Sequence, residues 1–168
     1  VVWIAGLPMV GIPLAAAGVF ALFFFRNPSR SCPFGPATAC APADGKVIKV
    51  CPAPSEMERL GLPKQVSIFM SVFNVHVNRI PSSGKITAVS YHPGQFVPAD
   101  RDAASLRNEQ NAVFLETEKG VGICVVQIAG LIARRIICHV QAGDRIKRGQ
   151  RFGLICFGSR LDLYIPAE

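Results

Sequence analysis

The sequence predicts a mainly β protein, with few short helices and with a hydrophobic segment ahead of the β domain. Three observations predict this class. The first 25 residues carry no charged side chain, eight short strand-like runs follow in the remainder of the chain, and turn residues separate those runs. A length of 168 residues suits one domain with a hydrophobic core of its own.

Residues 1–26 form the predicted hydrophobic membrane-anchoring segment. An uncharged stretch of this length can cross a bilayer as a helix. Pro8 and Pro13 would kink that helix, so a shallow monotopic insertion is the competing prediction, and a buried core helix is the third. Arg26 and Arg30 follow directly, and basic flanks favour the cytoplasmic side. We therefore expect the protein at the cell inner membrane, on its cytoplasmic face.

The rest of the chain divides by composition into a linker, residues 27–42, and a β-rich domain, residues 43–168. The linker contains four Pro residues, which neither helices nor central strands tolerate. The predicted strands are β-branched or alternating runs at 46–51, 65–70, 85–91, 112–116, 122–128, 135–140, 152–157 and 161–165. Short helices are predicted around 55–60 and 103–109.

Two turn segments refine the predicted architecture. Residues 41–47 and 142–150 resemble turns of biotinyl and lipoyl carrier domains, whose two small β halves pack into a flattened barrel. That resemblance implies a barrel-sandwich-like β domain. A carrier also needs a modifiable Lys on an exposed hairpin, and the corresponding stretch offers Arg134 and Arg135 instead. We predict a shared fold element rather than carrier function, and a non-enzymatic membrane-tethered barrel stays as an alternative.

The net charge of +7 admits either nucleic acid or anionic lipid as a partner. Basic residues are dispersed, without an aromatic-interleaved stripe or zinc-finger spacing, so no nucleic-acid partner is expected. Beside an apolar N-terminal segment, anionic membrane lipid is the better explanation. The six cysteines include no C-x-x-C pair, which argues against a metal site, and we expect free thiols.

The most informative dipeptide is Gly158-Ser159, which lies between two apolar runs. Glycine has no Cβ, so a nucleophile can reach its carbonyl carbon and an unusual backbone is tolerated. The next residue supplies a hydroxyl group. The pair is therefore the minimum equipment for a chain that attacks its own backbone. Taken alone, it would more simply be a glycine bulge followed by an ordinary serine.

Six further segments favour the interpretation that this dipeptide is a self-cleavage site. They are FFFRNP at 23–28, PADGKV at 42–47, FMSVFNVHVNRIP at 69–81, YHPG at 91–94, NEQN at 108–111 and IAGLIARRI at 128–136. Together with FGSR at 157–160, this ordered set resembles phosphatidylserine decarboxylase, in the short form found in bacteria and archaea. The resemblance covers nearly the whole chain, and the ordered set is specific although each piece alone is weak.

The resemblance implies a proenzyme that makes its own cofactor. Ser159 would attack the Gly158 carbonyl, and cleavage would leave residues 1–158 as the β chain and residues from 159 onward as the α chain. The cofactor would be a pyruvoyl group derived from Ser159, with no metal and no pyridoxal phosphate. A ketone that forms a Schiff base with the substrate amine accepts the electrons that decarboxylation releases. The implied reaction converts phosphatidylserine to phosphatidylethanolamine in phospholipid biosynthesis.

The resemblance also implies roles for acid–base residues. Asp44 matches the family Asp of self-cleavage, and His76 matches a histidine near the pyruvoyl group that could return a proton to the substrate Cα. Longer bacterial relatives carry a second histidine where this chain has Arg79, which cannot act as a base at neutral pH. His92 is the candidate substitute for the self-cleavage base.

Substrate binding and substrate identity are left more open. Arg134, Arg135 and Lys46 are candidates for the substrate phosphate or carboxylate, because guanidinium and ammonium groups fit such oxyanions. The substrate could also be the archaeal lipid archaetidylserine, or a soluble amino acid, which would need no membrane anchor. The α and β chains would remain partners, and a homo-oligomer is left open.

Overall fold

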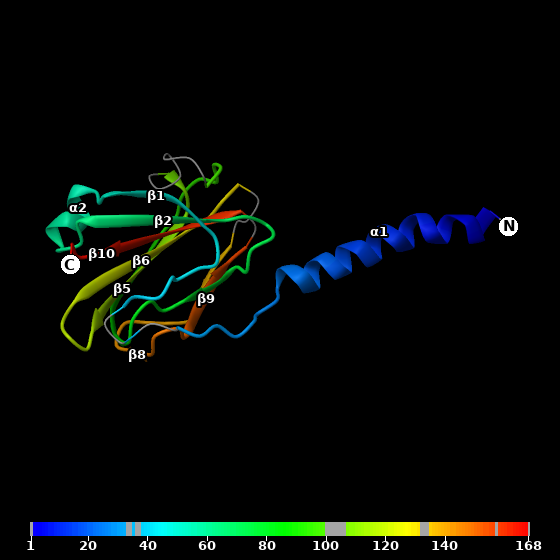
Figure 1. Cartoon of the computed structure of the whole chain (residues 1–168). Coiled ribbons are helices and arrows are strands. Elements are labelled where there is room, and N and C mark those ends of the chain that lie inside the picture. Colours follow the sequence, from blue (N-terminus) through cyan, green and yellow to red (C-terminus); the bar gives the residue numbers. More distant parts are fainter. Residues whose placement is uncertain are drawn as a thin grey trace.

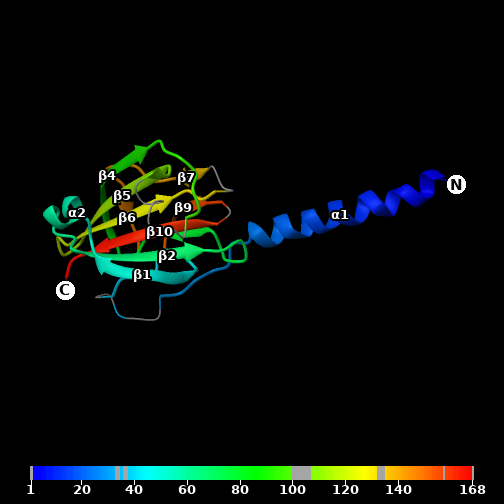
Figure 2. The ribbon, with the colours of Figure 1, turned by 90° about the horizontal axis from the view of Figure 1, so that it is seen from above.

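The structure is a computed structural model that describes residues 2–32, 35, 38–99, 107–131, 135–156 and 158–167, and side chains from Met9 onward. A β domain carries one long helix, α1 (Val2–Phe24), which projects away from it (Figures 1 and 2). The predicted mainly β class is confirmed, since α2 (Ser55–Arg59) is a short helix and the other described elements are strands.

The strands form two antiparallel sheets. In chain order they are β1 (Lys46–Pro52), β2 (Lys64–Met70), β3 (Val77–Arg79), β4 (Gly84–His92), β5 (Gln110–Thr117), β6 (Gly122–Ile128), β7 (Ile136–Cys138), β8 (Arg145–Ile146), β9 (Arg151–Ile155) and β10 (Ser159–Ile165). Seven of them pair in the order β1-β2-β10-β6-β5-β4-β8, and the other three in the order β3-β9-β7. The C-terminal strand β10 therefore lies in the middle of the larger sheet, between β2 and β6 (Figure 2).

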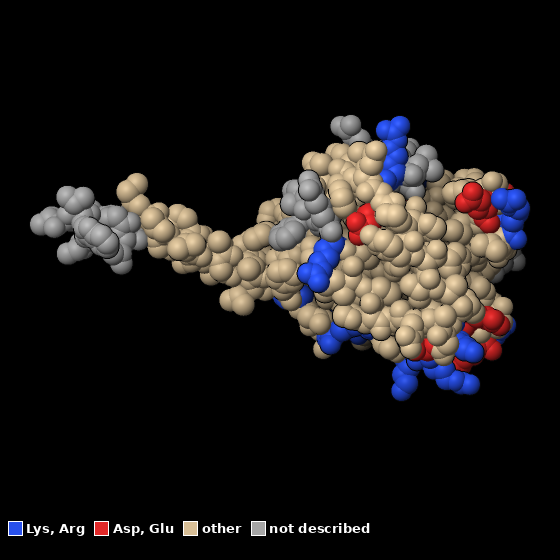
Figure 3. Space-filling model, turned by 180° about the vertical axis from the view of Figure 1, so that it is seen from behind, with Lys and Arg blue, Asp and Glu red and all other residues tan. Residues whose placement is uncertain are grey.

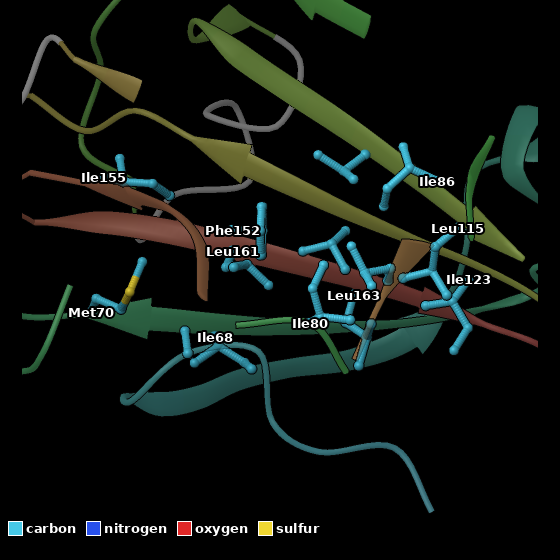
Figure 4. Close-up of a cluster of buried hydrophobic side chains, with 14 residues drawn as sticks. Ile68, Met70, Ile80, Ile86, Leu115, Ile123, Phe152, Ile155, Leu161 and Leu163 are labelled. Carbon is cyan, nitrogen blue, oxygen red and sulfur yellow. The ribbon is translucent and has the colours of Figure 1, made fainter. Parts of the chain in front are cut away.

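The main hydrophobic core lies between the two sheets (Figure 4). Alternate residues of β10, including Leu161 and Leu163, face it from the larger sheet, and Phe152 and Ile155 of β9 face it from the smaller one. Each such side chain contributes about 1.5–3 kcal/mol when it leaves water. We call this set the sandwich core, and it fixes which residues of each strand point inward.

A second apolar cluster covers the opposite face of the larger sheet. It includes Cys124, Val126 and Ile128 of β6 and Tyr164 of β10, with Met57 of α2 packed against it. The strand β10 is thus buried on both faces, and every residue from Ser159 to Tyr164 is buried. Burial of the thiol raises the pKa of Cys124 to about 12, so Cys124 is a small apolar side chain here and not a nucleophile.

The predicted elements correspond well to the observed ones. Each of the eight predicted strands overlaps an observed strand, and the helix predicted around 55–60 is α2. The sequence missed the short strands β3 and β8. The helix predicted around 103–109 lies mostly outside the described residues. The N-terminal segment is one helix from Val2 to Phe24 although it contains Pro8 and Pro13.

No helix within the described residues has both the length and the apolar character that crossing a membrane requires.

The expectation of free thiols is wrong for one pair, because Cys32 and Cys40 form a disulfide. The Thr38 N–H donates to the Gly35 carbonyl between these two cysteines, and the two Cα atoms lie 6.2 Å apart. That separation is within the range that a disulfide spans. Cys51, Cys124, Cys138 and Cys156 carry free thiols.

Candidate active site

Ser159 opens β10 with its side chain in the interior of the protein. It pairs with Met70 of β2, a member of the sandwich core, so the two side chains lie on the same inward face of the sheet. Gly158 has a φ of +63°, in the left-handed region that glycine adopts without strain. Ser159 is 0% exposed, and its Oγ has no hydrogen-bond partner among the described residues.

His76 is the second buried polar side chain with an unpartnered atom. Its Nδ1 lies 3.0 Å from the carbonyl oxygen of Asn74, and the side chain is 3% exposed. Because a carbonyl oxygen only accepts, Nδ1 carries the proton and Nε2 keeps a free lone pair. Burial lowers the pKa of His76, the Asn74 carbonyl raises it in part, and the nearby Arg26 charge lowers it further. The imidazole is therefore a neutral base at pH 7.

Strand pairing places His76 in the same region of the fold as the Gly158-Ser159 bond. The carbonyl oxygen of His76 accepts from the Ile155 N–H at 3.3 Å, and β3 continues beside β9 from Val77. Ser159 follows Ile155 by four residues, a chain length that spans at most about 14 Å. Among the described residues, Ser159 Oγ and His76 Nε2 are the two buried side-chain atoms that lack a partner. Such atoms are rare in native proteins and each calls for an explanation.

A chain of buried amides crosses the interior beside this pair. Gln127 of β6 donates to Asn78 Oδ1 at 2.8 Å and accepts from Asn111 at 3.1 Å, and Asn78 in turn donates to the sulfur of Met70 at 3.7 Å. These contacts join the two sheets next to Ser159, since Met70 is its strand partner. The sequence did not single out these residues, although Asn78 and Asn111 lie inside two of the family-like segments.

A buried ion pair holds the opposite face of β10. Arg160 contacts both carboxylate oxygens of Asp162, at 2.6 and 3.0 Å, and donates to Ser67 of β2 at 2.8 Å. Gln65 donates to Asp162 at 2.9 Å. Arg160 is 1% and Asp162 0% exposed. Sequence reasoning missed this network, although two charged residues that alternate with Leu in a strand are a signal for it.

Asp44 is paired with an arginine of the linker. Arg30 contacts both carboxylate oxygens, at 2.5 and 3.3 Å, and this contact raises the pKa of Arg30. Asp44 nevertheless lies at the same end of the sheet as Ser159, because Lys46 and Arg160 both pair with Phe69. The strands β1 and β10 are two spacings apart, roughly 10 Å. The structure thus places Asp44 at the end of the sheet that holds the predicted cleavage bond, and among the described residues its side-chain partner is Arg30 and not an imidazole.

His92 is not brought together with Ser159. It ends β4, is exposed, and its Nε2 lies 3.0 Å from the Ser90 hydroxyl. The register places His92 opposite Gln110, then Ile128 and then Arg160, three strands away. This row points to the outer face of the sheet, whereas Ser159 points inward. Sequence order alone could not show this difference, and it makes His76 the better-placed base.

Comparison with known proteins agrees with this constellation. The sequence matches the phosphatidylserine decarboxylase family over residues 17–168. It is 52% identical over 167 residues to the phosphatidylserine decarboxylase proenzyme of Syntrophus aciditrophicus, covering 99% of this chain and 75% of that one. The proenzyme of the same name in Geobacter metallireducens is 46% identical over 184 residues, which cover 99% of this chain and 84% of the relative.

The chain belongs to the phosphatidylserine decarboxylase family.

A third relative gives the same result. The phosphatidylserine decarboxylase proenzyme of Rickettsia akari is 48% identical over 156 residues, covering 90% of this chain and 67% of the relative. The resemblance drawn from the motifs is therefore confirmed, and the chain is an enzyme of the carboxy-lyase class. In the described part of the chain, no group of His, Cys, Asp or Glu side chains is placed to hold a metal ion.

The cations predicted to bind substrate in this decarboxylase lie at separate places. Lys46 is exposed at the start of β1, in the same row as Arg160. Arg135 is exposed just before β7, and its carbonyl accepts from the Cys156 N–H at 3.5 Å, close to the cleavage bond. Arg134 lies outside the described residues. Figure 3 shows Lys and Arg spread over the domain, with some of them where the helix joins it.

Proposed function

We propose that this protein is a proenzyme that cuts itself between Gly158 and Ser159 and then decarboxylates phosphatidylserine to phosphatidylethanolamine. Family membership supports the reaction class and the substrate named for its relatives. The single observation in the fold that supports self-cleavage is the pair of buried, unpartnered atoms, Ser159 Oγ and His76 Nε2, beside a glycine in the left-handed conformation.

Self-cleavage needs only the chain's own groups and one water molecule. Neutral His76 takes the Ser159 Oγ proton, and Oγ attacks the Gly158 carbonyl carbon, which converts the peptide bond to an ester and frees the Ser159 nitrogen as an amine. Elimination across Cα–Cβ of Ser159 then releases Gly158 as a carboxylate and leaves dehydroalanine. Water hydrolyses that group to a pyruvoyl cap and ammonia. Asp44 is assigned, as a prediction, to the support of this step.

The surroundings of Ser159 fit a pyruvoyl group at the start of the α chain. The first residue of β10 faces the interior beside His76 and the buried amides, and the Arg160–Asp162 pair holds the strand in the sheet after its connection to Gly158 is lost. When present, this ketone supplies the electron sink that decarboxylation of an amino acid requires. Once His76 is protonated at Nε2, it can deliver that proton to the substrate Cα.

Helix α1 is proposed to attach the enzyme to the membrane. Its apolar side chains are largely exposed, with Met9 at 80% and Leu22 at 79%, and Phe73 of the neighbouring loop is 68% exposed. Burying such surface in lipid is favourable by about 0.8 kcal/mol per CH₂. The basic residues Arg26 and Arg30 and the net charge of +7 would favour anionic lipid on the cytoplasmic face of the inner membrane.

The decisive measurement is the intact mass of freshly purified protein. We expect two chains, with the smaller one starting at the remnant of Ser159 and blocked by a pyruvoyl group. One uncut chain with an unmodified serine would contradict the proposal. Incubation of the cut enzyme with vesicles that contain phosphatidylserine, archaetidylserine or neither, and with free serine, separates the substrate alternatives. Size-exclusion chromatography in detergent tests the homo-oligomer.

A further inference from the structure

The last turn of α1 packs directly on the catalytic imidazole. The ring centroids of Phe24 and His76 are 4.3 Å apart, with an interplanar angle of 36°. Phe24 is 1% exposed, although Leu22 on the same helix is 79% exposed. Phe24 belongs to neither of the two apolar clusters of the β domain. Its burial is therefore specific to the site and not a part of the general core.

Arg26 ties the same turn to the loop that holds His76. The guanidinium donates to the carbonyl oxygens of Phe23 at 2.9 Å and Phe73 at 2.7 Å, and it lies 3.8 Å over the Phe23 ring. Phe73 precedes Asn74, whose carbonyl accepts from His76 Nδ1. Contacts thus run without interruption from the end of the helix to the imidazole.

The Asn74 loop has little freedom of its own. Asn74 Oδ1 accepts from both the N–H and the hydroxyl of Ser71, at 2.9 and 2.8 Å, and the Asn74 N–H donates back to Ser71 at 3.0 Å. These three hydrogen bonds close the turn into one unit. Arg26 fixes the unit against the helix, and Phe24 fixes the plane of the imidazole.

One hydrogen bond leaves an imidazole free to swing about its Cβ–Cγ bond. A flat aromatic surface against one face removes that freedom, and it also excludes water from the ring. Both effects serve a base that must present Nε2 to a buried hydroxyl, because general-base catalysis depends first on geometry.

We propose that Phe24 and Arg26 are positioning residues for His76, which makes the last turn of α1 a working part of the self-cleavage site and couples attachment of the helix to maturation. The inference rests on the proposed function, because it takes His76 as the base. It adds that the segment expected to serve only as an anchor also shapes the chemistry.

The first test measures His76 itself, without activity. In full-length Ser159→Ala protein in detergent micelles, the His76 imidazole is titrated by NMR. Phe24→Leu keeps apolar volume but removes the flat ring, so water reaches the imidazole and its pKa should rise toward 6.5. Arg26→Met removes the charged group that acts on His76 and should shift the pKa in the same direction. The matched control is Leu22→Ala, on the exposed side of the helix, which should leave the titration unchanged.

The second test measures cleavage against pH in protein that retains Ser159. Phe24→Leu and Arg26→Met should each slow cleavage roughly 10-fold or more, and the acid limb of the rate profile should move to higher pH. A general loss of packing would lower the rate at every pH without moving that limb. If Phe24→Leu proves unstable, Arg26→Met carries the test, since Arg26 is only partly buried.

If both variants show the same His76 titration and the same cleavage profile as the wild-type protein, the inference is overturned. Failure of the proposed function looks different, because wild-type protein would then stay uncut while the titration in the Ser159→Ala background still reported the packing of Phe24 on His76.

Discussion

At the residue scale, the site depends on two polar atoms that the fold buries and leaves unpaired. A buried group without a hydrogen bond costs about 1–3 kcal/mol, and Ser159 Oγ and His76 Nε2 both lack a partner within the described structure. Selection for stability alone would remove such atoms. Selection for a reaction would keep them, because a nucleophile and its base must be free to react with each other.

Replacement of Ser159 tests the nucleophile. Ser159→Ala should abolish cleavage completely, because alanine has no β-oxygen to form the ester or to leave in the elimination. Intact-mass spectrometry should show one chain, with full β structure by circular dichroism. Appearance of the two chains in this variant would mean that a different bond or residue is used.

Replacement of the histidines tests the base. His76→Gln should slow cleavage about 10²-fold or more, the usual scale for lost general-base help. His92→Gln should cleave like the wild type, because His92 is exposed and lies on the opposite face three strands from β10. Time courses by gel electrophoresis separate the two. A slow His92 variant beside a normal His76 variant would restore the assignment made from sequence.

The lowered pKa of His76 predicts how pH acts on the protein. The folded state binds its proton less tightly than the unfolded state does, so this residue contributes stability above its unfolded pKa of about 6.5 and that contribution is lost as the pH falls. Cleavage, which needs the neutral ring, should be at its plateau at pH 7 and fall in acid. In the His76→Gln variant, the melting temperature should depend less on pH between 7 and 5.

At the element scale, β10 is both a central strand of the larger sheet and the strand that begins with Ser159. It runs through the centre of the larger sheet, paired with β2 along its whole length and with β6 along most of it. Its first residue, Ser159, is the proposed nucleophile, and the next residue forms the buried ion pair with Asp162. A strand held on both edges keeps its place when the bond before it is cut, so the new chain end stays in the site.

The Arg160–Asp162 pair should matter for the retention of the α chain. Asp162→Asn leaves the Arg160 charge buried without its carboxylate, and removal of one partner of a buried pair typically costs about 3–5 kcal/mol. We expect a lower midpoint of urea unfolding and release of the α chain from the cut enzyme at lower urea concentration. The matched control is Asp44→Asn, in the exposed pair with Arg30, with both substitutions compared in uncut Ser159→Ala protein, where the proposed cleavage role of Asp44 plays no part. It should shift the urea midpoint much less.

At the scale of the whole molecule, a β sandwich carries an exposed apolar helix that projects away from it (Figure 1), and the last turn of this helix contacts the domain through Phe24. Phe24 is buried while side chains farther up the helix are exposed. A deletion that removes the proposed anchor should therefore stop before Phe24, because a cut through residue 25 would also uncover His76.

Removal of residues 1–19 should separate membrane attachment from folding. The shortened protein should no longer float with anionic vesicles, since most of the exposed apolar surface of α1 is lost, and it should keep a folded β domain. Flotation at low and high salt measures the apolar and the charge contributions separately. Complete flotation of the shortened form at high salt would place the anchor on another surface, such as the one around Phe73.

The sequence by itself determined the local structure and the chemical class. The strands followed from period-two patterns and turn residues, which act over a few positions. The Gly158-Ser159 pair and the ordered segments identified the family. The short strands β3 and β8 were not predicted, because a run of two or three residues is too short to show a period-two pattern. The sequence shows Arg160 and Asp162 as two charged residues that alternate with Leu in a strand. Only their burial in the structure shows that this ion pair stabilises the position of the strand.

The tertiary structure decided which residues share a site. Strand register turned Ser159 inward and His92 outward, a distinction that a shift of one residue would reverse. Pairing of β3 with β9 placed His76 in the region of the fold that holds the proposed cleavage bond, and Phe24 packs against the His76 ring. Each of these contacts joins residues far apart in the chain. Their energies depend on which faces are buried together, and no local pattern of amino acids contains that information.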